Sequence, residues 1–385
     1  MKIATHNADY IKQYNRNLIM RLLIAEPLSR AELARKTGLT RQTLSNIADE
    51  LLAERLVTEE ESPEKKRGRN PVLLCLKNDA FYAVGVYLSR TGCRVGLVDI
   101  QGQIVQEEKI RQEITSDNGE FLNLVADTAQ RLIDLSAVEQ NKVLGVGISS
   151  PGPVQEQTGM ILNPPGFERW HHTDVATPIQ QKTGLKTIVE NNAYSLAGYE
   201  RTYGNGKVLD NFLLLLVDSG IGCGIISNGK LYQGTHRLSG EIGHTSINFS
   251  GEQCSCGNYG CLELYAAIPN LLQRFGYAQD SWSDIVIQAK AGEPRAVRLI
   301  EQEADYLTAG IVNAVNLLDM EAVILDGDIM DVFELVQPYM EVQINSKVIT
   351  RGFGAVKLLP SSGHKSQQVA AAANIIFSRY FNGII

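Results

Sequence analysis

The chain has 385 residues, of which 44% are apolar and 21% charged, an ordinary composition for a globular protein of two or three domains. It contains no run of about eighteen apolar residues and no basic-then-apolar N-terminus, so we expect a cytoplasmic protein without a membrane span. The net charge of −7 is uneven, because residues 1–75 carry 13 Lys and Arg against 10 Asp and Glu, and the rest carries 23 against 33. A basic N-terminal module on an acidic body favours nucleic acid at one end and a small ligand at the other.

The N-terminal module has the pattern of a helix-turn-helix. Residues 17–25 show the apolar spacing of a helix, and Ser29 with Glu32 has the pattern of a capping box at the start of a second one. Gly38 is typical of the end of that short helix, and a third helix is predicted over residues 41–52. Helix, glycine-containing turn and helix in this order predict a DNA-binding unit.

The third helix presents polar side chains at its N-terminal end, because Leu44, Ile47 and Leu51 take up its inward face. In a helix-turn-helix this end lies against base edges in the major groove. Arginine can pair with guanine there, and glutamine or asparagine with adenine. The candidate base-contacting residues are Arg41, Gln42, Thr43, Ser45 and Asn46.

A basic loop follows, between two short strands predicted over residues 56–58 and 72–76. Most charged runs are solvated loops, but this one comes where the wing of a winged helix belongs. A wing can lay cationic side chains along phosphates or into a minor groove. The candidate wing contacts are Lys65, Lys66, Arg67 and Arg69, and we expect double-stranded DNA as the partner.

From residue 81 the pattern changes to α/β. The predicted strands cover residues 81–88, 94–100, 143–149, 212–217, 222–227 and 230–232, another begins at Ile104, and a helix covers 119–135. Asn228-Gly229 is a strong hairpin signal between the last two strands. Two hairpin units, each leading into α/β structure, suggest a duplicated, two-lobed fold with a cleft between the lobes.

Asn191 and Asn192 lie where a short strand is predicted to meet a helix. The residues alone leave two interpretations open. The amides can act only as helix N-caps, or they can hold a ligand, since each offers two donors and an acceptor. Upstream, residues 163–167 form a turn-rich loop that can close over a ligand.

One histidine and three cysteines fall within residues 244–261, interleaved with glycines. Tetrahedral zinc takes four N or S ligands, and a Cys3His set is a structural type. Unrelated buried cysteines are the alternative, but Cys-x-Cys-x4-Cys with a histidine upstream favours a Zn²⁺ site. The candidate ligands are His244, Cys254, Cys256 and Cys261. Glu241 and Glu263 frame this cluster, so the metal would hold them as paired acceptors for a ligand rich in hydroxyls.

The runs Gly240–His244 and Cys254–Glu263 make the chain resemble the ROK family (repressors, open reading frames and sugar kinases) over essentially its whole length. It is most similar to the winged-helix, sugar-responsive repressors of that family. The resemblance implies an α/β fold in which a winged helix-turn-helix precedes a two-lobed, actin-like or hexokinase-like domain with a structural zinc. The expected domains are the winged helix (1–77), an N-terminal lobe (78–190) and a C-terminal lobe (191–385) whose last helix returns to the N-terminal lobe.

The resemblance also implies a sugar in the cleft and an oligomer, either a homodimer or a homotetramer. In the family's pattern the histidine binds zinc through one ring nitrogen and can face the sugar with the other. Residues 358–362 are similar to the xylose-repressor branch of the family. The positions that match the family's sugar site are Asn191, Asn192, Glu241, His244 and Glu263.

Two departures from the ROK kinases argue against catalysis. Those kinases carry Asp-x-Gly-Gly-Thr in the first hairpin, whereas residues 87–92 read Tyr-Leu-Ser-Arg-Thr-Gly. They also use Glu-Asn-Asp with the aspartate as general base, and here that position is Asn192, whose amide cannot accept the proton. A second glycine-rich loop persists over residues 218–224. We therefore predict a sugar-responsive repressor of carbohydrate genes that is not an enzyme; the alternatives are a zinc-containing sugar kinase and a repressor controlled by a protein partner.

Overall fold

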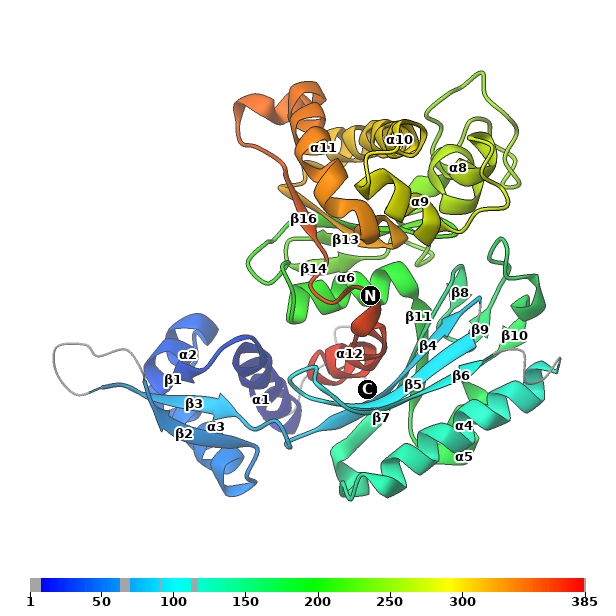
Figure 1. Cartoon of the computed structure of the whole chain (residues 1–385). Coiled ribbons are helices and arrows are strands. Elements are labelled where there is room, and N and C mark those ends of the chain that lie inside the picture. Colours follow the sequence, from blue (N-terminus) through cyan, green and yellow to red (C-terminus); the bar gives the residue numbers. More distant parts are fainter. Residues whose placement is uncertain (1–7, 63–69, 91, 112–116, 384–385) are drawn as a thin grey trace.

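A computed structural model describes residues 8–62, 70–90, 92–111 and 117–383. They form an N-terminal winged helix followed by two α/β lobes (Figure 1), as the sequence predicts. Within these ranges no helix is both long enough and apolar enough to cross a membrane.

The N-terminal module combines a helix-turn-helix with a three-stranded sheet. Its elements are α1 (Ala8–Ala25), β1 (Leu28–Ser29), α2 (Arg30–Thr37), α3 (Arg41–Ala53), β2 (Val57–Glu61) and β3 (Val72–Leu76), with strand order β1-β3-β2. The predicted capping box is confirmed, since Ser29 and Glu32 each bond the other's backbone amide. Gly38 ends α2 with φ at 72°, a left-handed conformation that glycine adopts without strain.

Helix α1 begins at Ala8, well upstream of residue 17, where the apolar spacing starts. Ion pairs with α3 support this added length. Lys12 Nζ lies 2.8 Å from Glu50 Oε1, and Arg16 pairs with Glu54. Hydrophobic periodicity in the sequence could not reveal the first turns of α1, because charged side chains make the contacts of these turns with α3.

The N-terminal lobe is built on a five-stranded sheet of order β11-β7-β4-β5-β6. These strands are β4 (Tyr82–Ser89), β5 (Gly92–Asp99), β6 (Ile104–Arg111), β7 (Val143–Ser150) and β11 (Thr187–Asn191). The first three are antiparallel neighbours, and β7 and β11 add in parallel. Helices α4 (Asn118–Leu135) and α5 (Thr177–Thr183) pack on one face, while β8 (Val154–Gln155), β9 (Met160–Ile161) and β10 (Thr173–Asp174) form a small separate sheet.

The C-terminal lobe repeats this topology in the order β14-β13-β12-β15-β16. Its strands are β12 (Phe212–Val217), β13 (Ile221–Ser227), β14 (Lys230–Tyr232), β15 (Ala322–Gly327) and β16 (Lys357–Pro360). Again the first three are antiparallel and the last two parallel, so the predicted duplication is confirmed. The helices on its outer side are α7 (Leu262–Ala266), α8 (Ile268–Arg274), α9 (Trp282–Lys290), α10 (Pro294–Leu318) and α11 (Phe333–Lys347) (Figure 1).

Two helices, α6 (Asn192–Thr202) and α12 (Gln368–Phe381), lie between the two sheets (Figure 1). Helix α12 rests directly on the N-terminal sheet, because a Cβ on Gly85 or Gly147 would come 1.9 Å from one of its carbonyl oxygens. Helix α6 packs on β13 and against α12. The last helix of the chain therefore contacts the first lobe.

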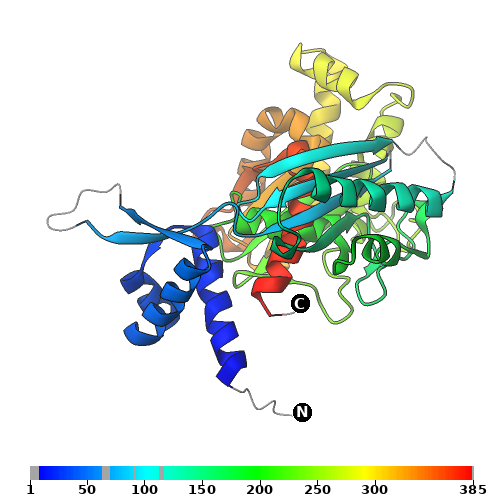
Figure 2. The same ribbon diagram turned by 90° about the horizontal axis from the view of Figure 1, so that it is seen from below.

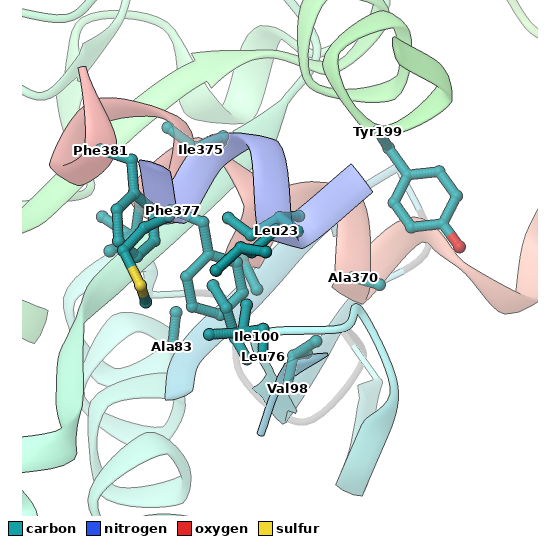
Figure 3. Close-up of a cluster of buried hydrophobic side chains, with 14 of the residues drawn as sticks. Leu23, Leu76, Ala83, Val98, Ile100, Tyr199, Ala370, Ile375, Phe377 and Phe381 are labelled. Atoms are coloured by element: carbon teal, nitrogen blue, oxygen red, sulfur yellow. The ribbon is translucent and has the colours of Figure 1, made fainter. Parts of the chain in front are cut away.

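One hydrophobic core joins the winged helix to both lobes. Leu23 of α1 and Leu76 of β3 belong to the same buried cluster as Phe377 and Phe381 of α12 (Figure 3). Seen from below, the winged helix projects to one side of the lobes, with α1 on the side of the module that faces them (Figure 2). The N-terminal module is thus packed onto the body through α12.

Candidate functional site

The four predicted metal ligands converge. One ligand atom from each of His244, Cys254, Cys256 and Cys261 lies within 4.8 Å of all the others, so the cluster could hold a metal ion. The Cys254 sulfur is 3.6 Å from His244 Nδ1, and the sulfurs of Cys256 and Cys261 are 3.7 Å apart. Since the ligands come from one short stretch of chain, the sequence spacing was sufficient to find them.

Glycines allow the backbone to turn tightly around this cluster. Gly257 and Gly260 have φ values of 93° and 60°, a region that other residues rarely adopt. A Cβ on Gly260 would also lie 1.7 Å from the carbonyl oxygen of Asn248. The side chain of Asn258 donates to the carbonyl oxygen of His244 at 3.1 Å, which ties the cysteine loop to the histidine turn.

The thiols of Cys256 and Cys261 differ in acidity. A hydrogen bond from the Asn258 backbone lowers the pKa of Cys256. Burial, followed by the thiols of Cys256 and Cys254, raises the pKa of Cys261 to about 12. Thiolates are the form that binds metals, and a shared cation is what would hold all three sulfurs in that form.

A cavity of about 660 Å³ opens between the lobes beside this cluster. Its size is within the usual range for ligand sites, about 300–1,000 Å³. It lies at the carboxyl ends of β7, β11 and β12, where open α/β sheets place their ligands. All five residues predicted for the sugar site line it: Asn191, Asn192, Glu241, His244 and Glu263.

The two framing glutamates enter the cavity from different elements. Glu263 is in the first turn of α7, and its Oε2 accepts a hydrogen bond from the Ile221 amide at 3.0 Å. A Cβ on Gly220 would lie 3.0 Å from the same oxygen, so a glycine lets the loop come this close. Partial burial of the Glu241 carboxyl raises its pKa, an effect that His244 opposes and Glu263 reinforces.

Asn191 is the N-cap of α6, Asn192 is the first residue of that helix, and both border the cavity. The backbone amide of Ala193 donates to Asn191 Oδ1 at 2.8 Å and to Asn192 Oδ1 at 2.9 Å. The interpretation as a helix cap is therefore confirmed for Asn191. It does not exclude a ligand role, because each side chain also carries an NH2 group that can donate.

Arg90, in the turn between β4 and β5, reaches across the cleft and was not among the predicted site residues. It donates to the carbonyl oxygens of Pro165 and Gly166 at 2.8 and 2.9 Å, and to the hydroxyl of Ser219 on the other lobe. Ser219 is 129 positions away in the sequence. No local signal could mark such a contact.

Asp218 lines the same cavity at the end of β12. Burial, followed by the neighbouring Asp328 carboxyl, raises its pKa to about 6. The backbone amide of Ser219 donates to its Oδ1 at 2.8 Å. A carboxyl at the head of the glycine-rich run 218–224 is a sequence signal that could have identified it.

The predicted DNA-contacting side chains of α3 lie near its N-terminus. Arg41, Gln42 and Asn46 are exposed, while Thr43 and Ser45 are half-buried. Gln42 donates to Asn46 at 2.9 Å, one turn further along the helix. Exposed amides in this arrangement are available to base edges.

The predicted wing residues lie outside the described residues: Lys65, Lys66, Arg67 and Arg69. The strands on either side of them belong to the described residues. Strands β2 and β3 pair in antiparallel register, and the amide of Ser62 donates to Pro71 at 3.0 Å. The two paired strands that a wing requires are therefore present, one before and one after residues 63–69.

The fold and the site define the class of the protein as a two-lobed α/β body, with a cavity between its lobes and a winged helix packed on it. Comparison with known proteins identifies the family. The model described as ROK family matches residues 83–377, and the one described as MarR family matches residues 17–68. The chain belongs to the ROK family.

Relatives with this whole architecture are regulators. The chain is 30% identical over 383 residues to the xylose repressor of Bacillus subtilis (strain 168), covering 97% of this chain and 98% of the relative. A solved ROK family transcriptional regulator, described as a homolog of the E. coli MLC protein, superposes with a TM-score of 0.82 at 27% identity, covering 97% of this chain and 98% of its own. A ROK family glucokinase from Streptomyces griseus, solved with glucose and AMPPNP, reaches 0.63 at 25% identity, covering 98% of its own chain but 76% of this one.

Proposed function

We propose that this protein is a sugar-responsive transcriptional repressor of carbohydrate-utilisation genes. The observation that carries the proposal is the convergence of five polar residues, from separate elements of the chain, on one cavity in a protein that also has a helix-turn-helix. Its similarity to a xylose repressor over 97% of its length supports this assignment. Because its site of action is DNA, the proposed location is the cytoplasm.

The sugar would bind through the carboxylates of Glu241 and Glu263 and the amides of Asn191 and Asn192. Sugar hydroxyls donate to carboxylates in charge-assisted hydrogen bonds, which are stronger than neutral ones. The asparagine oxygens already accept from the Ala193 amide, so their NH2 groups would donate to the sugar. The imidazole of His244 would contribute its second ring nitrogen.

The Cys3His cluster would hold Zn²⁺ in a structural role. Two sulfurs bound to one tetrahedral zinc at about 2.3 Å each lie about 3.8 Å apart. The 3.7 Å separation of the Cys256 and Cys261 sulfurs fits that value. A closed set of four protein ligands leaves no position for substrate, so the ion would brace the loops that carry Glu241 and Glu263 and perform no chemistry.

At the other end of the molecule, α3 would enter the major groove. Arg41, Gln42, Thr43, Ser45 and Asn46 would face base edges, and the cationic residues of the wing, Lys65, Lys66, Arg67 and Arg69, would contact phosphates. A homodimer would place two such modules on the halves of a palindromic operator. Sugar binding would favour one closure of the lobes and weaken operator binding, which requires different sugar affinities in the two states.

The absence of kinase activity is part of the proposal. Asn192 stands where a kinase of this family needs a carboxylate base, and an amide cannot take a proton from a sugar hydroxyl. Arg90 occupies the turn where the kinases carry paired glycines, and its guanidinium bonds Ser219 across the cleft.

A thermal-shift panel tests the proposal, using D-xylose, D-glucose, N-acetyl-D-glucosamine and sucrose on the zinc-loaded protein, with and without MgATP. One sugar should raise the melting temperature regardless of MgATP, and should weaken binding to an operator selected from a random duplex library. Stabilisation that needs MgATP, or a phosphorylated product, would establish the kinase instead. A protein that binds its selected DNA but responds to no sugar would point to control by a protein partner.

A further inference from the structure

An ion-pair network ties α12 to both lobes. Arg379, near the end of α12, donates through Nη2 to Glu156 Oε2 at 2.8 Å and to Glu190 Oε1 at 2.9 Å. Arg237 pairs with the same Glu156 oxygen at 2.6 Å, and Gln233 donates to the same Glu190 oxygen at 3.2 Å. The side chains of Arg379 and Glu190 are only 12% and 9% exposed, so salt and water screen their attraction weakly.

The members of this network belong to segments that form the cleft. Glu190, on β11 of the N-terminal lobe, directly precedes Asn191. Arg237 lies on the C-terminal lobe, in the loop that leads to Glu241. A second cavity of about 500 Å³ is lined by Glu156, Glu190, Gln233 and Arg237 and shares Asn191, Tyr194 and Leu238 with the cleft. Arg237 and Gln233 lie on the C-terminal lobe and their partners Glu156 and Glu190 on the N-terminal lobe, so closure around a ligand would change the two bonds between them.

The same end of α12 is bonded to the winged helix. The buried side chain of Asn17 on α1 donates to the carbonyl oxygen of Tyr380 at 3.2 Å. Arg21, one turn further along α1, donates to Asn382 Oδ1 at 2.5 Å. Tyr380 is the residue next to Arg379, so the network and the contact with α1 are adjacent on one helix end.

Apolar packing extends this contact and passes it to α3. Leu23 of α1 and Phe381 of α12 lie in one buried cluster (Figure 3). The ion pair between Lys12 and Glu50 then links α1 to α3, the proposed recognition helix. Close-packed interiors transmit a displacement because they contain few voids to absorb it.

We propose that Glu190 and Arg379 are positioning residues that couple sugar binding to operator release, an inference that rests on the proposed function. Closure of the lobes moves Glu190 and Arg237 relative to each other, and Arg379 carries the change to the end of α12. The displacement of α12 moves α1, which packs against it, and the displacement of α1 moves α3. Neither Glu190 nor Arg379 lines the cleft, so breaking their pair uncouples the two sites without removing a sugar contact.

The test uses Arg379→Met in the full-length, zinc-loaded protein, with D-xylose as the probe. Sugar affinity is measured by calorimetry, and operator affinity by fluorescence anisotropy with and without saturating D-xylose. In the wild type, D-xylose should weaken operator binding roughly 5- to 150-fold, the usual range of allosteric coupling. In Arg379→Met that change should fall below about twofold, while the Kd for D-xylose stays within about threefold of wild type. A residue that merely stabilised the fold would not separate these two readouts.

Two further variants make the result decisive. Arg131→Met removes an arginine from an ion pair with Glu108 on the surface of the N-terminal lobe, away from α12, and should respond like the wild type. Glu190→Gln keeps the shape of the side chain and removes its charge, so it should give an intermediate response and replaces Arg379→Met if that protein does not fold. A full response in the folded variant overturns the coupling alone. A wild type that responds to neither D-xylose nor any other sugar of the panel overturns the proposed function, and the coupling with it.

Discussion

Glu263 offers the sharpest test of the cleft, because its two carboxylate oxygens have different tasks. Oε2 accepts from the Ile221 amide at 3.0 Å, which leaves the other oxygen for a ligand in the cavity. Glu263→Gln preserves the size of the side chain and one oxygen for that amide. It replaces the second acceptor with an NH2 group and removes the charge. The substitution therefore alters the proposed sugar contact and conserves the packing against Gly220.

The expected loss follows from one charge-assisted hydrogen bond. Such a bond contributes about 1.5–3 kcal/mol. Since each 1.4 kcal/mol is a factor of ten, the Kd of Glu263→Gln for the stabilising sugar should rise roughly 10- to 150-fold. Operator affinity without sugar should not change, because Glu263 lies on the C-terminal lobe and the winged helix packs through α1 and α12.

Calorimetric titration of the sugar, together with zinc content and melting temperature, makes the measurement. Glu252→Gln is the matched control, because Glu252 is an exposed carboxylate in the cysteine loop whose partner is Arg274 at 2.9 Å. This control should bind sugar like the wild type. If Glu263→Gln binds sugar within twofold of wild type, at full zinc content and unchanged melting temperature, the site assignment is refuted.

The remaining predictions concern the metal, the helix packing, the DNA contact and the pH dependence of stability. The protein should contain one zinc per chain, and Cys256→Ser should lose the ion by elemental analysis, lower the melting temperature and weaken sugar binding, since the cluster braces the glutamate loops. Gly147→Ala should lower the free energy of unfolding by about 1–3 kcal/mol in urea titrations, because its Cβ would come 1.9 Å from the backbone of α12; Gly352→Ala, with nothing within 4 Å, is its control. Arg41→Ala should cost about 1–3 kcal/mol of binding to the selected operator, with little loss on unrelated DNA. The folded-state pKa of Asp218, about 6, is above the ordinary aspartate value of 3.8, so the folded state holds the extra proton. Stability should therefore fall as the pH rises from about 4 to about 6, and less so in Asp218→Asn, as measured by urea titrations across that range.

The parts of the site that the sequence predicts are those whose residues are close together in the chain. His244 and the three cysteines lie within one short segment, and their spacing alone indicates a tetrahedral cluster. The bond from Arg90 to Ser219 spans 129 positions, and that from Arg379 to Glu190 spans 189. The first contact depends on how the two lobes face each other and the second on how α12 returns to the first lobe, and no local pattern of hydrophobicity or charge contains either.

The asparagine pair shows a different limit. Helix capping and ligand binding require the same residue type at the same place, so the pattern at Asn191 and Asn192 could not separate them. The Ala193 amide donates to both side chains, Asn191 is the N-cap, and both side chains lie at the edge of the cavity. Capping fixes the two amides in position before any ligand arrives, which reduces the entropy lost on binding.

In a kinase fold that keeps the cleft but lacks the base, the binding free energy of the sugar can favour one conformation of the protein where it no longer accelerates a reaction. In an enzyme, only interactions that strengthen in the transition state raise the rate. In the proposed repressor, with Asn192 in place of the base, the sugar would be bound and released unchanged, so its contacts could instead favour one arrangement of the lobes. Moving a two-state equilibrium from 1:99 to 99:1 requires a preference of about 5.5 kcal/mol for one state. Two or three charge-assisted hydrogen bonds made only in the closed state supply this amount, at about 1.5–3 kcal/mol each. In the proposed site, Glu241 and Glu263 on one lobe would make two such bonds, and the neutral Asn191 amide at the end of β11 on the other lobe would add a weaker one, while a metal in the Cys3His cluster would keep the two carboxylates fixed as the lobes move.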